Sequence, residues 1–200
     1  MTRFRLIISL VCGVVLLALI GYTLVRPTPR PAQAPMADVQ IGGPFRLVDQ
    51  DGRAVDQTLL KGRWTAVFFG FTYCPDVCPT TLQTLGTETQ ILGPEAKALQ
   101  IVFVSVDPGR DSPAALKAYL ASPGFPKGVI GLTGTAQQVA DAAKAYRVYF
   151  AKEGEGEAYL VNHTSLIYLM NPSGKFARVL AYGLTPDETA NQIRQAMAEK

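Results

Sequence analysis

Two cysteines of this sequence, Cys74 and Cys78, are separated by three residues, and each is followed by a proline. An apolar run precedes them and helical spacing follows, so we expect both thiols at a helix N-terminus, where free amides and the helix dipole stabilise a thiolate. Thiolates bind soft metal ions and also attack disulfides. The spacing leaves room for an ion and also permits a Cys74–Cys78 disulfide. Buried structural thiols are the alternative, but two prolines on an exposed loop fit that packing poorly.

The chain has one histidine, His163, which stands just before an apolar run over 166–170. A lone histidine is more often an ordinary surface or core residue than a ligand. We expect the loop before this strand to face the cysteine loop, however, so that the imidazole and the two thiolates converge. Two sulfurs and one nitrogen suit Cu(I), or Cu(II) when an oxygen ligand joins, whereas zinc prefers a fourth ligand. We therefore predict that Cys74, Cys78 and His163 bind one copper ion per monomer.

Four charged residues near these ligands are candidates for a supporting role. Asp107, Arg110 and Asp111 follow a predicted strand, and they fit either a docking surface or a set of contacts that supports the metal ligands. Equally, Asp107 with the proline after it can simply turn the chain, and Asp111 can lie near a helix N-terminus. Asp76, between the cysteines, either tunes the site or caps the helix that follows, and we favour the cap.

The strands and the helix around the cysteines are predicted from hydrophobic patterning. Continuous apolar runs over 66–71 and 101–106 predict two strands that are buried on both faces. Leucines from Leu82 to Leu92 recur at helical spacing between these runs, which predicts a βαβ unit with parallel strands. Asp51-Gly52 lies between two short extended segments and predicts an N-terminal β-hairpin.

The second half of the chain is predicted to close the same sheet. The run over 166–170 should pair with 176–182 across a turn as an antiparallel hairpin. Further helices are predicted to begin at Ser112, Thr135 and Thr185. This order predicts an α/β thioredoxin-like fold with an extra N-terminal β-hairpin and an inserted helix. The cysteine loop then lies at the carboxyl end of the sheet, where open α/β sheets place their sites.

Residues 1–25 are predicted to form a transmembrane anchor, because the stretch from Leu6 to Val25 is uncharged and its roughly 20 residues can span the hydrocarbon core. A cleaved signal peptide would have a shorter apolar stretch. Residues 26–38 are rich in proline and predict a semi-rigid spacer or a plain tether, which leaves residues 39–200 as the folded domain.

The composition of the chain excludes some classes of protein. The chain has 200 residues and a net charge of +3, and its lysines and arginines are scattered, which argues against a nucleic-acid partner. Three cysteines do not make a disulfide framework, and Cys12 lies inside the apolar stretch, where a thiol behaves as a small hydrophobe.

Three segments closely resemble the Sco/SenC family of copper proteins, and the resemblance covers nearly the whole chain. These segments are GFTYCPDVCPTTL (70–82), SVDPGRD (105–111) and NHTSLIYLMNPSG (162–174). The resemblance implies Cys74, Cys78 and His163 as copper ligands and an acidic loop at Asp107 and Asp111. It also implies delivery of copper to the binuclear copper site of cytochrome c oxidase subunit II, with another copper chaperone as a candidate donor.

One position departs from the family pattern. Asn162 stands where the family usually has aspartate, and the lost charge is expected to weaken Cu(II) binding more than Cu(I) binding.

Arginines flank the apolar stretch on both sides, so the orientation in the membrane must follow from the chemistry. A target copper site outside the membrane requires the domain to be periplasmic. The short segment before the apolar stretch is not a long Arg- and Ser-rich amphipathic leader, so the sequence does not support a mitochondrial transit peptide. We therefore expect a bacterial inner membrane protein with a single span.

Competing functions differ in which residues they need. A metallochaperone needs the histidine and the two cysteines and involves no catalytic turnover, so we expect the protein not to be an enzyme. A thiol:disulfide oxidoreductase that reduces the cysteines of the same target needs only Cys74 and Cys78. A peroxiredoxin-like peroxidase would need a Thr-x-x-Cys arrangement, whereas Thr72 lies two positions before Cys74. His163 therefore discriminates between the first two functions.

Overall fold

The structure is a computed structural model that describes residues 40–156 and 158–199. The predicted anchor, the proline-rich spacer and Cys12 lie outside the described residues. Within the part that is described, no helix combines the length and the apolar character needed to cross a membrane.

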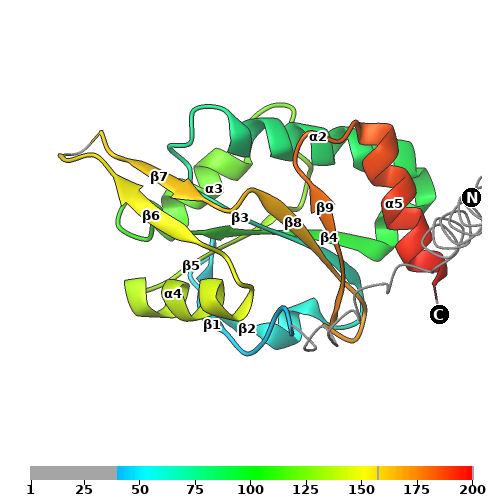
Figure 1. The fold of residues 1–200 in the computed structure, drawn as a ribbon, viewed down its shortest axis with the longest axis horizontal. Coiled ribbons are helices and arrows are strands. Elements are labelled where there is room, and N and C mark those ends of the chain that lie inside the picture. The colour runs from blue at the N-terminus through cyan, green and yellow to red at the C-terminus, as the bar shows by residue number, and fades with distance from the viewer. Residues whose placement is uncertain (1–39, 157, 200) are drawn as a thin grey trace, which may run out of the picture. The chain divides into compact units, whose positions relative to one another are not determined.

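A seven-stranded mixed sheet forms the centre of the domain (Figure 1). Strands β3 and β4 are parallel neighbours in the middle, β5 continues the parallel set, and β8 pairs antiparallel with β3 on the other side. The antiparallel hairpins β1–β2 and β8–β9 complete the two edges. In spatial order the strands are β2 (Ala54–Asp56), β1 (Arg46–Asp49), β5 (Ile130–Thr133), β4 (Leu99–Ser105), β3 (Trp64–Gly70), β8 (Leu166–Met170) and β9 (Phe176–Ala181).

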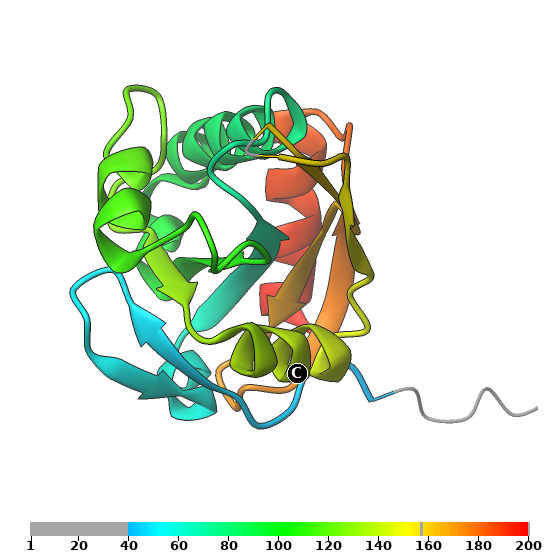
Figure 2. The same cartoon turned by 90° about the vertical axis from the view of Figure 1, so that its left-hand side faces the viewer.

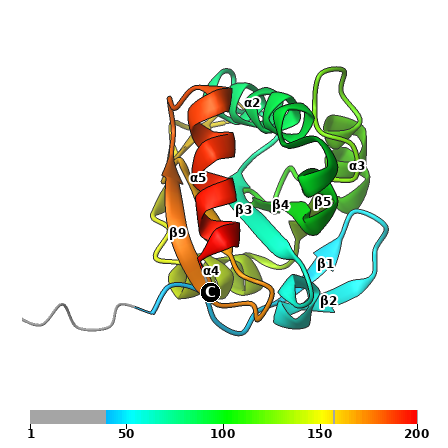
Figure 3. The ribbon, with the colours of Figure 1, turned by 90° about the vertical axis from the view of Figure 1, so that its right-hand side faces the viewer.

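Helices cover both faces of this sheet. The crossovers β3–α2–β4 and β4–α3–β5 run in the same direction along the sheet, and because such crossovers are right-handed they place α2 and α3 on one face. Helix α5 packs beside α2 on that face, and α4 lies on the opposite face (Figures 2 and 3). The helices are α2 (Val77–Leu92), α3 (Pro113–Leu120), α4 (Ala136–Ala145) and α5 (Pro186–Ala198), with short 3₁₀ helices η1 (Gln57–Leu60) and η2 (Gly93–Ala98).

The predicted helix starts are confirmed by hydrogen bonds at the caps. Ser112 accepts a hydrogen bond from the Ala115 amide, and Thr135 and Thr185 each form a reciprocal capping box. Helix α2 ends where Gly93 adopts φ +57, a conformation that favours glycine. The predicted βαβ unit and both predicted hairpins are also present, so the thioredoxin-like arrangement is confirmed.

Three strands were not predicted. β5 lies between the helices that begin at Ser112 and Thr135, and it was not predicted because its four residues include Gly131 and give little periodicity. β6 (Phe150–Glu153) and β7 (Leu160–His163) form a separate two-stranded sheet that extends away from the rest of the domain (Figure 1). His163 is therefore the last residue of a strand, and the expectation that it lies in a loop before the third core strand is wrong.

Candidate metal centre

The cysteine loop joins the end of β3 to the start of α2. Cys74 lies in a turn, where its amide donates to the Phe71 carbonyl oxygen, and Cys78 is the second residue of α2. Cys78 is completely buried, whereas Cys74 is partly exposed. The two thiols therefore differ in how readily a partner molecule can reach them.

Asp76 occupies the N-cap position of α2, but its side chain caps no amide. Its carboxylate instead accepts a hydrogen bond of 3.2 Å from the Thr80 hydroxyl. The favoured prediction of a side-chain cap is therefore wrong. The backbone angles at Asp76 (φ −143, ψ −68) differ from the extended conformation that usually directs a capping side chain toward the first turn.

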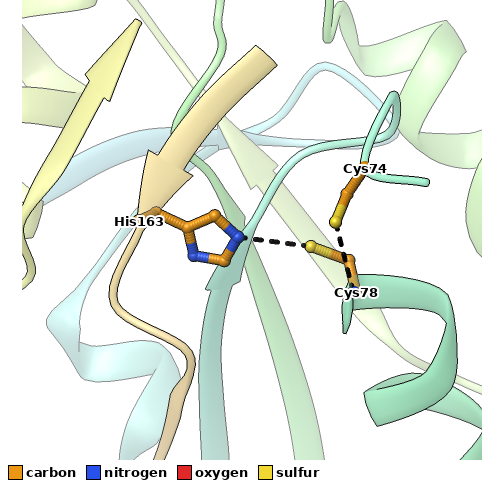
Figure 4. Close-up of side chains that lie close together, drawn as sticks. All are labelled: Cys74, Cys78 and His163. Carbon is orange, nitrogen blue, oxygen red and sulfur yellow. Dashed lines mark hydrogen bonds between the residues drawn. The ribbon is translucent and has the colours of Figure 1, made fainter. Parts of the chain in front are cut away.

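The structure brings the three predicted ligand side chains together (Figure 4). Cys74 Sγ, Cys78 Sγ and one nitrogen of His163 all lie within 4.8 Å of one another. His163 Nε2 is 3.4 Å from Cys78 Sγ, and the Cys78 amide lies 3.4 Å from Cys74 Sγ. The histidine reaches the thiols from the end of β7, so the site joins two elements that are far apart in the sequence.

A hydrogen bond on the far side of the imidazole fixes its tautomer. His163 Nδ1 lies 3.0 Å from the Thr164 carbonyl oxygen. A carbonyl only accepts, so Nδ1 carries the proton and Nε2 presents a lone pair toward the sulfurs. This orientation is the one that metal-binding histidines use.

The spacing of the three atoms fits a small metal ion. Bond lengths of about 2.3 Å to sulfur and about 2.0 Å to nitrogen leave ligand atoms roughly 4 Å apart around one ion. The observed separations, all within 4.8 Å, therefore require only small side-chain movements. Two sulfurs and one nitrogen form a soft donor set that suits copper.

The two thiols have opposite acidities. The hydrogen bond from the Cys78 thiol is the main reason that the pKa of Cys74 falls to about 4; burial opposes this, and hydrogen bonds from backbone amides add to it. The hydrogen bond to Cys74, burial, and the negative charge of the Cys74 thiolate together raise the pKa of Cys78. Near neutral pH the pair is thus one accessible thiolate and one buried thiol.

Gly70 lies directly behind the cysteines and was not among the predicted site residues. A Cβ at this position would lie 2.8 Å from Cys78 Sγ and 2.8 Å from the Phe103 ring. Glycine at the end of a buried strand is the sequence feature that could have indicated this close approach. Phe71 and Phe68 pack edge-on against the His163 ring, with centroid distances of 5.8 and 6.3 Å.

Asp111 supports the cysteine loop from beneath. It is completely buried and accepts hydrogen bonds from the Thr72 amide (3.1 Å), the Thr72 hydroxyl (2.6 Å) and the Ser105 hydroxyl (2.6 Å). Burial raises the pKa of Asp111, although these hydrogen bonds oppose the rise. Because the carboxylate is buried, the structure contradicts a docking role for Asp111 and favours a supporting one.

Asp107 and Arg110 form a second group beside the cysteine loop. The Arg110 guanidinium is 2.5 Å from the Asp107 carboxylate, which also accepts a hydrogen bond of 2.6 Å from the Tyr159 hydroxyl. The amides of Arg110 and Asp111 donate to the Asp107 carbonyl oxygen, so the predicted chain turn is confirmed. Asp107 is 5% exposed and, like Asp111, is too buried to form a docking surface.

Asn162 points away from the ligands. Successive residues of a strand face opposite sides, so its side chain lies on the other face of β7 from His163. There it donates a hydrogen bond of 3.1 Å to Glu153 on β6. An aspartate at this position would therefore act on the metal only from across the strand.

Comparisons with known proteins agree with this geometry. The SCO1/SenC family model matches residues 33–198. A SCO2-like protein of Rickettsia conorii is 34% identical over 197 residues, covering 96% of this chain and 95% of that protein. The copper-bound structure of Bradyrhizobium japonicum ScoI superimposes with a TM-score of 0.71 at 41% identity, covering 78% of this chain and 99% of that one.

A further solved structure is relevant to the cysteines. It is that of BsSco, a member of the Sco family of cytochrome c oxidase assembly proteins in which a disulfide switch was identified. It has a TM-score of 0.64 at 28% identity and covers 81% of this chain and 96% of that one. The described fold is therefore that of copper-binding Sco proteins, and the chain has a Cys-Cys-His group that can bind one copper ion.

Proposed function

The chain belongs to the SCO1/SenC family, and we propose that it is a copper metallochaperone that delivers copper to the binuclear copper site of cytochrome c oxidase subunit II. The observation that carries this proposal is the convergence of two thiols and one correctly oriented imidazole within 4.8 Å. We assign Cys74, Cys78 and His163 as the copper ligands, with one copper per monomer. Another copper chaperone is the candidate donor.

Unequal access to the ligands supports transfer by ligand exchange. Cys74 is the partly exposed thiolate, so a ligand of the acceptor protein can displace it first, while Cys78 and His163 still hold the ion. Each exchange replaces one metal–ligand bond by another, so the copper keeps its oxidation state. Once the copper has left, Cys78 takes up one proton from solvent and Cys74 stays a thiolate near neutral pH, and the process needs no catalytic turnover.

Thiol:disulfide exchange is the second candidate function, and the opposite acidities of the two cysteines favour it. The Cys74 thiolate would attack a disulfide of the target protein, forming a mixed disulfide and releasing one target thiolate. Cys78, once deprotonated, would then attack Cys74 Sγ and release the second target thiolate, leaving a Cys74–Cys78 disulfide. An external thiol reductant must restore the pair before another cycle.

Membrane attachment completes the proposal. Residues 1–25 would anchor the chain in a bacterial inner membrane, residues 26–38 would act as a spacer, and residues 39–200 would form the periplasmic copper-binding domain. The uncharged stretch from Leu6 to Val25 and the location of the proposed target support this arrangement. A reporter that is active only after export, fused after Lys200, should be active; activity of a cytoplasm-only reporter at the same position would contradict the orientation.

The variant His163→Ala separates the two functions. It leaves two thiolates, which suffice for disulfide exchange and for weakened Cu(I) binding, whereas Cu(II) binding should be almost abolished. We expect the folded variant to fail in oxidase maturation while its Cys74–Cys78 disulfide forms at the normal rate. Normal oxidase maturation at native expression without added copper would contradict copper delivery and favour the oxidoreductase.

A further inference from the structure

The hairpin that carries His163 is not a continuation of the central sheet. β6 and β7 pair with each other and extend away from the domain (Figure 1). A histidine on such an element needs contacts with the rest of the domain to stay opposite the cysteines. One such contact forms at the start of β7, at the opposite end of the strand from His163.

Tyr159, the residue directly before β7, is held by two groups of the segment between β4 and α3. Its hydroxyl donates a hydrogen bond of 2.6 Å to Asp107, and the Arg110 guanidinium stacks 3.6 Å from the centroid of its ring. Lys152 of β6 lies 3.8 Å from the centroid of the same ring. Hydrogen bonds to a carboxylate and cation–π contacts are among the stronger polar interactions of partly buried sites.

Arg110 extends this contact to the cysteine loop. Its guanidinium also lies 4.5 Å from the centroid of the Tyr73 ring, and Tyr73 directly precedes Cys74. It is 5.9 Å from the Phe71 centroid, and Phe71 in turn packs edge-on against the His163 ring. One ion pair, between the buried Asp107 and the partly exposed Arg110, therefore contacts both halves of the candidate metal site.

The register of β7 connects Tyr159 to the ligand. Residues 159, 161 and 163 share one face of the strand, and Val161 between them is buried, so this face is turned toward the domain. At about 3.3 Å per residue, Tyr159 lies about 13 Å along the strand from His163. Fixing the strand at this distant point limits its rotation and keeps the imidazole directed at the thiols.

We propose that Tyr159, held by Asp107 and Arg110, is a positioning residue that keeps His163 in the coordination sphere. We call these three residues the hairpin clamp. The proposal rests on the assignment of Cys74, Cys78 and His163 as ligands. With the clamp intact the site offers three ligands; with the clamp released it offers the two thiols and an imidazole that is no longer held in place.

The clamp is tested by copper binding to the full chain in detergent, with Tyr159→Ala and Tyr159→Phe compared with the wild type. Loss of a residue that orients a metal ligand typically lowers metal affinity about 10- to 100-fold. We expect Tyr159→Ala to lower Cu(II) affinity at least about tenfold and to weaken the nitrogen coupling in the Cu(II) EPR spectrum. Cu(I) affinity should change less than about threefold, because two thiolates suffice for Cu(I).

Tyr159→Phe keeps the ring on Arg110 and loses only the hydroxyl, so its Cu(II) affinity should lie between those of Tyr159→Ala and the wild type. Tyr149→Ala is the matched control, because Tyr149 precedes β6 in the same hairpin and its side chain is 62% exposed. This control should bind both copper ions as the wild type does. If Tyr159→Ala fails to fold by circular dichroism, Tyr159→Phe decides alone.

Wild-type Cu(II) affinity and EPR coupling in a folded Tyr159→Ala, or in Tyr159→Phe when it decides alone, would overturn the clamp. Equal losses of Cu(I) and Cu(II) affinity would also overturn it, since a positioning role acts through His163. His163→Ala is measured in parallel. If His163→Ala loses Cu(II) and the Tyr159 variants do not, only the clamp fails. If His163→Ala retains Cu(II) at wild-type affinity, the ligand assignment fails.

Discussion

Cys78 Sγ and His163 Nε2 are 3.4 Å apart, yet the elements that carry these two residues are attached to the domain in different ways. The cysteine half lies at the junction of β3, β4 and α2, where Gly70, Phe103 and Asp111 surround it with buried atoms. The histidine half is the end of a separate two-stranded sheet, which is attached to the domain by the short links to α4 and β8 and by side-chain contacts. Cys78 is therefore fixed by the packing of the core, whereas the position of His163 depends on how the hairpin is attached.

The largest expected effect is on the cysteine half. Asp111→Ala would leave the Thr72 amide, the Thr72 hydroxyl and the Ser105 hydroxyl without their acceptor in a buried site. We expect the free energy of unfolding to fall by about 3–4 kcal/mol, with loss of both Cu(I) and Cu(II) binding. Chemical denaturation and anaerobic Cu(I) titration measure the two effects.

Asp51→Ala is the control for Asp111→Ala, since Asp51 forms only surface ion pairs with Arg53 and Lys117. It should behave as the wild type in both measurements. A stable Asp111→Ala with normal copper binding would show that the cysteine loop does not depend on the support beneath it, and the comparison of a firm half with a loosely attached half would lose its basis.

Glu88 on α2 is expected to make the free energy of unfolding depend on pH. It is 1% exposed on α2, and burial raises its pKa to about 7 against the opposing effect of the Thr189 hydroxyl on α5. The folded state therefore binds more protons than the unfolded state between the ordinary glutamate pKa and about 7, so stability falls as the pH rises through this range and levels off above it. A shift of this size corresponds to about 3 kcal/mol at most.

Glu88→Gln should remove this dependence. The variant should match the wild type near pH 4.5 and exceed its stability near pH 8, by denaturation measured across the range. Glu155→Gln, at an exposed glutamate between β6 and β7, is the control and should follow the wild type. Parallel curves for wild type and Glu88→Gln would show that the buried carboxyl does not titrate between these pH values.

Gly70→Ala is a smaller change at the cysteine half. The added Cβ would lie 2.8 Å from Cys78 Sγ and 2.8 Å from Phe103, so the thiol or the ring must shift. We expect a loss of about 1–3 kcal/mol in stability and weaker binding of both copper ions. Gly43→Ala is the control, because its nearest contact is Ala145 Cβ at 3.4 Å. A wild-type denaturation curve for Gly70→Ala would mean that the Cys78 and Phe103 side chains can move aside without a loss of stability.

The contrast between the two halves also explains what the sequence could predict. Strand β3, helix α2 and strand β4 were predicted because continuous apolar runs and helical spacing express their burial directly. The hairpin was missed because none of the four residues of β6 is buried: Phe150 and Ala151 are half-buried and Lys152 and Glu153 are exposed, so the strand has neither an apolar run nor an alternation. Tyr159 was missed for a related reason, since a tyrosine that bonds across the fold has no local signature.

The support for the site was predicted only in part. The motif Asp107 to Asp111 indicated that these residues matter, but patterning could not distinguish a docking surface from buried support. The decision depends on the long-range hydrogen bonds of Asp111 to Thr72 and of Asp107 to Tyr159, whose partners are fixed only when the chain folds.

The smallest expected effect concerns the outer face of the hairpin. Asn162→Asp restores the acidic residue that Sco proteins usually have before the histidine, and the family pattern alone predicts stronger Cu(II) binding. Because the side chain lies across the strand from His163, we expect its charge to act through solvent and to contribute about 0.5 kcal/mol, roughly a twofold gain in Cu(II) affinity. The new carboxylate would also face Glu153, and this repulsion would offset part of the gain.

The double variant Asn162→Asp with Glu153→Gln removes the repulsion and should show the full twofold effect in a competition titration with Cu(II). A gain of tenfold or more in either variant would mean that residue 162 reaches the metal directly, so that β7 must rotate when copper binds and the hairpin is held less firmly than its contacts with Asp107 and Arg110 suggest.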